Sequence, residues 1–177
     1  QPWYKDEPLF IGPLLIHNTK SEEQHTSFMF KLRQLGIEIG AIGTDSEQAI
    51  LNAIGYIYPS AKHLICWRHF AENLTRFLHE LGTIIDQRNS LRQLFLGRAD
   101  FEGLVHSVDG SFDSNWQIVK GFIPLLLPVD KSVKFIKYIE QRTLQLIRKH
   151  MIKDVRNSVG VSGPWYTNVA ESGNNLL

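Results

Sequence analysis

The sequence lacks cysteine pairs, long hydrophobic runs and a large net charge. Its one cysteine, Cys66, cannot form a disulfide within the chain, which excludes a disulfide-based framework and fits a reducing compartment. The apolar run Phe122–Val129 is short and contains two prolines, so it does not predict a membrane span, and no signal peptide is visible. We therefore expect a protein without a membrane partner.

Charge is nearly balanced over the whole chain but not along it. The formal net charge is +1, which by itself does not indicate nucleic-acid binding. The stretch from Lys131 to Arg156 is locally basic, with eight lysine or arginine residues. A solvated helix face is the favoured interpretation of this stretch, and a surface that contacts phosphate backbones is the alternative.

The first half of the sequence alternates apolar runs with helical patterns. With 177 residues, 43% of them hydrophobic and 21% charged, the chain has the composition of one globular domain. The runs Leu9–His17, Ile37–Thr44 and His63–Cys66 predict strands, and each precedes a predicted helix. This order predicts an α/β fold with at least partly parallel strand pairing.

The second half of the sequence shows helical patterns and no convincing strand. In the first half, Ser21 predicts a helix N-cap and Gly36 predicts the end of that helix. From Gly82 onward the patterns are helical or irregular, and Val129–Met151 predicts one long helix. We therefore expect an all-helical insertion at 82–159, placed between an α/β part at 1–81 and a C-terminal helical segment at 160–177.

Asp45 is the first residue that could carry chemistry. It follows an apolar strand and precedes a helix, so it is expected at the carboxyl end of a strand, where α/β folds place their ligands. A carboxylate in that position can ligate a hard cation such as Mg²⁺. The alternative is a helix N-cap, provided by Asp45 or Ser46, and these residues alone favour the cap.

Two further candidates are weaker when each is taken alone. Cys66 and His69 are spaced like half of a zinc site, but no second pair with suitable spacing occurs, so a buried cysteine and a helix-starting histidine are favoured. Glu171 is expected in a helix, where a glutamate is usually solvated. The asparagines and serine around Glu171 are mediocre helix formers, which indicates selection for something other than helix stability.

Taken together, four segments resemble the transposase domain of Mutator-like elements. That family shows a Thr-Asp pair that opens a helix, then a Pro-x-Ala-x-His-Leu-x-Cys-x-x-His segment, and much later a Thr-Asn-x-x-Glu-Ser-x-Asn segment. All three occur here in this order, with Ser46 where the family commonly has glycine. The matching segments are Ile11–Phe28, Ile42–Ile54, Tyr58–Leu74 and Thr167–Leu177.

The resemblance implies an RNase H-like fold with an acid triad that holds two Mg²⁺ or Mn²⁺ ions. Asp45 would match the second acid and Glu171 the third, while Cys66 and His69 match the family's cysteine–histidine pair near the active site. The first acid of the family lies on a strand upstream of this sequence, and Asp6, in a loop-like setting, is not assigned that role. We therefore expect an incomplete sheet of about three strands and a chain that is inactive as given.

The resemblance also implies a nuclear DDE-type enzyme that catalyses metal-dependent DNA strand cleavage and transfer. Its partners would be transposon ends and target DNA, and it would act as a homo-oligomer. One alternative is a domesticated, transposase-derived DNA- or protein-binding module without catalysis. Another is an unrelated α/β domain whose motifs arose by chance, which is the interpretation favoured if Asp45 and Glu171 lie far apart.

Overall fold

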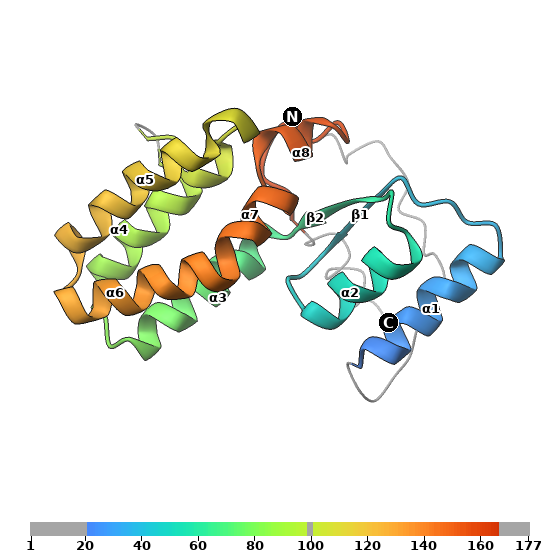
Figure 1. Ribbon diagram of the computed structural model, residues 1–177, viewed down its shortest axis with the longest axis horizontal. Coiled ribbons are helices and arrows are strands. Elements are labelled where there is room, and N and C mark those ends of the chain that lie inside the picture. Colours follow the sequence, from blue (N-terminus) through green and yellow to red (C-terminus); the bar gives the residue numbers. More distant parts are fainter. Residues whose placement is uncertain (1–20, 99–100, 167–177) are drawn as a thin grey trace, which may run out of the picture. The chain divides into compact units, whose positions relative to one another are not determined.

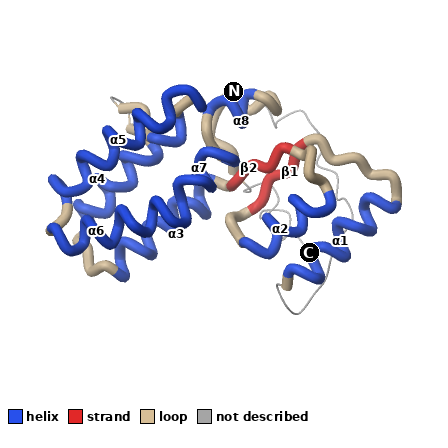
Figure 2. The backbone as a smooth tube through the Cα atoms, in the orientation of Figure 1, coloured by secondary structure: helices blue, strands red, loops and turns tan. Residues whose placement is uncertain are grey.

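The computed structural model describes residues 21–98 and 101–166. Over these residues the protein is a mostly helical α/β protein with a two-stranded parallel sheet (Figures 1 and 2). The predicted strand Leu9–His17 and the predicted helix around Glu171 lie outside the described residues. The chain divides into two compact units, one formed by residues 1–39 and 48–59 and the other by residues 40–47 and 60–177.

The described part of the first unit is a pair of helices, α1 (Glu22–Gln34) and α2 (Gln48–Ile57). The predicted cap is confirmed, because the Ser21 side chain accepts a hydrogen bond from the Gln24 amide at 3.3 Å. The predicted end of α1 is confirmed as well, since Gly36 has a φ of 76°. The two helices bury apolar side chains that include Met29, Leu32, Ala53, Ile54 and Ile57.

The sheet belongs to the second unit and consists of β1 (Ala41–Thr44) and β2 (Lys62–Ile65). The strands are parallel, as predicted, with Ala41 opposite Lys62 and Thr44 opposite Ile65. The predicted strand Ile37–Thr44 is too long at its start, because residues 37–40 precede β1 and do not join the sheet. Cys66 follows β2, and its amide still donates to the Thr44 carbonyl at 2.9 Å, so the pairing extends to the strand ends.

The rest of the second unit, as far as the structure describes it, is mostly helical, which confirms the helical pattern expected after Gly82. One isolated antiparallel bridge joins Arg98 and Phe101. In Figure 1, α3 to α6 lie side by side, and each of these helices contacts the next one along the chain. The elements are α3 (Trp67–Glu80), α4 (Ile85–Leu96), the 3₁₀ turn η1 (Leu104–His106), α5 (Asp109–Leu126), α6 (Val129–Tyr138), the π-helical turn η2 (Ile139–Thr143), α7 (Leu144–His150) and α8 (Lys153–Asn157).

Aromatic and aliphatic side chains form the core of this helical region. The Phe95 ring meets the Phe135 ring edge-on, with centroids 6.0 Å apart, and Phe77 stacks on Tyr138 at 3.7 Å. The long helix predicted over Val129–Met151 is present as α6, η2 and α7 in direct succession. These three helical elements follow one another without a loop, and His150 at the end of α7 contacts the sheet. There His150 Nδ1 donates to the His63 carbonyl at 3.0 Å.

The basic stretch from Lys131 to Arg156 does not form one solvated face. Lys131 donates to the Gly82 carbonyl at 2.7 Å, and Arg148 pairs with Asp109 at 2.7 Å. Arg156 is only 1% exposed. The interpretation of this stretch as a solvated face is therefore wrong for Arg156, whose guanidinium belongs to the core.

The helices within residues 21–98 and 101–166 are each too short or too polar to cross a membrane.

Candidate functional site

Asp45 follows β1 directly and is half-buried at the carboxyl end of the parallel strands. Its Oδ1 accepts a hydrogen bond from the Glu47 amide at 3.2 Å, which holds the turn that leads to Gln48, the first residue of α2. The N-cap interpretation is thus met in part, because one carboxylate oxygen supports the backbone before a helix. The second oxygen is not used in that turn.

The Asp45 carboxylate has no cationic partner among the described residues. Within the described residues, no lysine or arginine side chain forms an ion pair with it. A half-buried carboxylate at a strand end is usually neutralised or hydrogen-bonded on both oxygens, because removing charge from water costs free energy. The arrangement at Asp45 therefore leaves a negative charge that a bound cation would balance.

The charge of this carboxylate acts on His63, whose imidazole is neutral near pH 7. Burial and, to a smaller extent, the neighbouring His150 lower the pKa of His63 from 6.5 to about 4, while the negative charge of Asp45 opposes this shift. Burial lowers the pKa of His150 as well. Both imidazoles are uncharged near neutral pH, so neither of them neutralises Asp45.

A chain of hydrogen bonds fixes the orientation of His63. Thr44 Oγ1 donates its single proton to the Asp45 carbonyl at 2.7 Å, so it accepts from His63 Nε2 at 2.6 Å. His150 stands edge-on to the His63 ring, with centroids 5.0 Å apart. No sequence motif indicates this cluster, but the parallel register predicts it, because His63 lies opposite Ile42 and therefore on the same face of the sheet as Thr44.

A second hydrogen bond ties the Asp45 turn to the helical region. Asn73 on α3 donates to Ser46 Oγ at 2.7 Å. Ser46 was predicted as an alternative helix cap, and its hydroxyl instead accepts from a helix that begins more than twenty positions later. The Asp45 turn is thus held by two hydrogen bonds, one from the Glu47 amide to Asp45 and one from Asn73 to Ser46.

The Cys66 and His69 pair lies at the same edge of the sheet as Asp45. Cys66 is fully buried directly after β2, and His69 is half-buried in the first turn of α3. Because β1 and β2 are parallel, the residues that follow them share one edge. In the part of the chain that the structure describes, no three histidine, cysteine, aspartate or glutamate side chains gather closely enough to hold a metal ion.

The chain returns to this edge near its C-terminal end. The Trp165 carbonyl accepts from the Trp67 amide at 3.0 Å. The Trp165 indole lies so close to the Gly43 Cα that a side chain at position 43 would overlap the ring. Glu171, the other predicted acid, follows six positions after Trp165 and lies outside the described residues.

The parallel strands place Asp45, Cys66 and His69 at one edge of the sheet, and Glu171 lies outside the described residues. Among the described residues, this edge supplies a carboxylate without an ion-pair partner and a fixed turn, which suits a divalent cation only when further oxygen ligands complete the set. No protein-family model, curated protein or solved structure matches this chain.

Proposed function

We propose that this chain is part of a DDE-type DNA transposase with an RNase H-like fold, which cleaves and joins DNA strands with bound divalent cations. Asp45 and Glu171 supply two of the acids that hold these cations. The observation that carries the proposal is the unpaired, half-buried Asp45 carboxylate at the carboxyl end of two parallel strands. This position is where α/β folds place catalytic and ligand-binding groups.

The electrostatics of the edge support a cation rather than an internal ion pair. His63 has a pKa of about 4 and is neutral near pH 7. The Thr44 hydroxyl donates its proton to the backbone carbonyl of Asp45. A hard divalent ion is therefore the charge that would complement the Asp45 carboxylate, and carboxylate oxygens are the ligands that Mg²⁺ and Mn²⁺ prefer.

The path of the chain supports the participation of Glu171. Trp165 is fixed at the strand ends by its bond to the Trp67 amide and by its packing on Gly43. Six residues of extended chain span at most roughly 20 Å. This chain length is consistent with the proposal that Glu171 reaches the Asp45 edge, although the two acids are 126 positions apart in the sequence.

A pair of divalent ions would stabilise the negative charge that builds on the attacking and leaving oxygens during phosphoryl transfer. The described residues contribute positioning. Ser46, bonded to Asn73, holds the Asp45 turn on α3, and the hydrogen bond from Glu47 sets the carboxylate plane. Because these contacts are in place before any ligand binds, the carboxylate needs little rearrangement to meet a cation.

The test is a calorimetric titration with Mn²⁺ of the wild-type chain and of Asp45→Asn and Glu171→Gln. Each substitution removes a charged ligand but keeps the side-chain size, so we expect the affinity for Mn²⁺ to fall about tenfold or more in each. Asp86→Asn is the matched control, since Asp86 is an exposed acid in the first turn of α4. An isotherm that Asp45→Asn leaves unchanged would contradict the proposal.

Nicking of supercoiled DNA in Mn²⁺ is the second readout. Because the family's first acid lies upstream of this sequence, we expect no cleavage by the chain as given, and cleavage that Asp45→Asn abolishes would contradict that expectation. The second candidate is a DNA- or protein-binding module without catalysis. DNA binding that needs neither Mn²⁺ nor Asp45, together with no measurable Mn²⁺ binding, would favour this module.

A further inference from the structure

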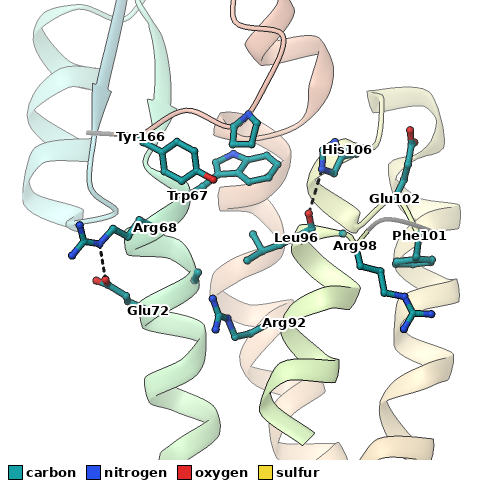
Figure 3. A pocket seen from close by; sticks show the side chains of 13 residues that line it. Trp67, Arg68, Glu72, Arg92, Leu96, Arg98, Phe101, Glu102, His106 and Tyr166 are labelled. Carbon is teal, nitrogen blue, oxygen red and sulfur yellow. Dashed lines mark hydrogen bonds and ion pairs between the residues drawn. The ribbon is translucent and has the colours of Figure 1, made fainter. Parts of the chain in front are cut away.

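A cleft of about 680 Å³ opens between α3, α4 and the segment that ends at Tyr166 (Figure 3). This volume lies within the range of small-ligand sites and is larger than a bare inorganic anion needs. All of its lining residues belong to the second unit, and none of them takes part in the hydrogen bonds that fix the Asp45 turn. The residues that carry the argument are Trp67, Arg68, Glu72, Arg92, His106 and Tyr166.

Two hydrogen-bond donors that line this cleft have no acceptor. Within the described residues, neither Trp67 Nε1 nor Arg92 Nε has a hydrogen-bond partner, although both atoms are shielded from solvent. Trp67 as a whole is only 5% exposed, and the two residues come from different helices, α3 and α4. Buried donors are paired in the great majority of cases, so two orphans around one cleft indicate a missing acceptor.

Arg92 is also a charge of the cleft that has no ion-pair partner among the described residues. Arg68 pairs with Glu72 at 3.0 Å, as Figure 3 shows, and burial lowers the pKa of His106 so that its imidazole is neutral near pH 7. In the described residues, no carboxylate forms an ion pair with Arg92. The missing acceptor is therefore expected to be negatively charged.

The exposed ring of Tyr166 lines the same cleft as these donors. Tyr166 lines the cleft and is 47% exposed, whereas the Trp67 ring is already covered by the Arg156 guanidinium at 5.0 Å and by the His106 ring edge. An exposed aromatic side chain next to an unpaired arginine is the combination that binds a base together with its phosphate.

We propose that this cleft binds one unpaired nucleotide of a DNA strand. A phosphate oxygen accepts from Arg92 and from the Trp67 indole, and the base stacks on Tyr166. The choice of DNA as the polymer rests on the proposed function, whereas the choice of an anionic ring compound rests on the cleft alone. In a strand-transfer enzyme, such a cleft would hold a nucleotide that has left the duplex near the cut, which deepens the proposed function by naming a substrate feature.

The test uses a short single-stranded oligonucleotide that carries 2-aminopurine, titrated into the full chain with a chelator present, so that metal binding plays no part. Stacking on Tyr166 quenches the 2-aminopurine, and base stacking is worth about 1–3 kcal/mol, so we expect Tyr166→Ala to weaken binding about fivefold or more. Tyr166→Phe keeps the ring and should bind like wild type. Arg92→Gln should weaken binding about tenfold or more and lower the salt dependence, because a phosphate contact is lost.

Two matched variants control for general effects. Arg76→Gln removes an exposed arginine from α3 outside the cleft, and Tyr56→Ala removes a tyrosine that is 75% exposed in the other unit. Both should bind like wild type, and circular dichroism should show every variant folded. Equal weakening by Arg76→Gln and Arg92→Gln, quenching that survives Tyr166→Ala, or full displacement of the oligonucleotide by equimolar inorganic phosphate would overturn the nucleotide cleft.

The outcome is separable from that of the proposed function. Quenching that depends on Arg92 and Tyr166, in a chain whose Mn²⁺ titration is indifferent to Asp45, would support the cleft and contradict the transposase site. Mn²⁺ binding that depends on Asp45, with no effect of Arg92→Gln on the oligonucleotide, would do the reverse.

Discussion

Two charged groups of the second unit, Asp45 and Arg156, differ in whether the chain itself supplies partners for their charge. Asp45 stands at the strand ends with no cationic partner among the described residues. Arg156 is 1% exposed, and its guanidinium donates to backbone carbonyls of Met151 at 2.9 Å and Gly163 at 2.7 Å. It also reaches the Val105 carbonyl at 3.4 Å and lies over the Trp67 ring.

This difference distinguishes a charge that stabilises the fold from a charge that is available to a ligand. A charge whose hydrogen-bonding capacity is filled by its own chain holds that chain together, and Arg156 fastens α8, η1 and the loop before Trp165 in this way. A charge left without an ion-pair partner at a sheet edge costs stability and persists when a ligand uses it. Arg156 therefore supports the structure, whereas Asp45 is the group for which we propose a chemical role.

The largest expected effect comes from removing the Arg156 guanidinium. Arg156→Met keeps much of the volume but leaves buried carbonyls without donors, so we expect the free energy of unfolding to fall by about 3 kcal/mol or more. Chemical denaturation measures this, with Arg76→Met as the control for losing an exposed arginine. A loss below about 1 kcal/mol for Arg156→Met would remove the contrast with Asp45.

The next effect is a pH dependence set by His63. Its pKa is about 4 in the folded protein and 6.5 when unfolded, so the unfolded state binds more protons between these values. Stability is fully present above pH 6.5 and falls as the pH drops towards 4, by roughly 3 kcal/mol for this 2.5-unit difference.

His63→Gln keeps a hydrogen-bond donor for Thr44 but does not titrate. Denaturation midpoints measured from pH 7.5 down to pH 4 should fall less in this variant than in wild type. His150, whose pKa burial also lowers, and Asp45, whose charge opposes the shift, face the same site and remain in both proteins. Identical pH profiles for the two proteins would contradict a neutral, buried His63.

A smaller effect tests whether Trp165 closes the edge beside Asp45. A methyl group at Gly43 would overlap the Trp165 indole, so Gly43→Ala should cost about 1–3 kcal/mol of stability. Trp165→Leu removes the obstructing ring, and the double variant should lose less than the sum of the two single variants. Additive losses in this double-mutant cycle would mean that Trp165 does not pack on Gly43 in solution.

The smallest effect is expected at a pair on the surface. Arg68 and Glu72 lie 3.0 Å apart, with side chains 56% and 52% exposed. Arg68→Gln should change the free energy of unfolding by about 0.5 kcal/mol or less, because solvent screens such pairs. A loss as large as that of Arg156→Met would show that burial does not set the strength of these charges.

Local signals in the sequence predicted the elements, and long-range contacts decided the site. Ser21, Gly36 and the two parallel strands were predictable because caps, helix ends and apolar runs are properties of neighbouring residues. The strand predicted from Ile37 begins only at Ala41, since the Ile37 carbonyl accepts from Tyr58 instead of joining the sheet.

The burial of Arg156, the contact between Thr44 and His63, and the cleft around Arg92 all join residues that are distant in sequence. Nothing in their local spacing distinguishes them. From the sequence, Arg156 is expected to be solvated because it ends a basic stretch, and only the fold places carbonyls around it. Arg92 is expected to have a partner like other helical arginines, and only the structure shows which residues surround it.

The claim that Asp45 and Glu171 share one cation pocket is tested most directly by cleavage of the protein with bound iron. Fe²⁺ replaces Mg²⁺ at oxygen sites and, with ascorbate and peroxide, generates radicals that cut the backbone close to the ion. We predict cuts in two segments, one around Asp45 and one around Glu171, and the loss of both cuts in Asp45→Asn alone. Cuts at one segment only, or cuts near Glu171 that persist in Asp45→Asn, would contradict a shared pocket.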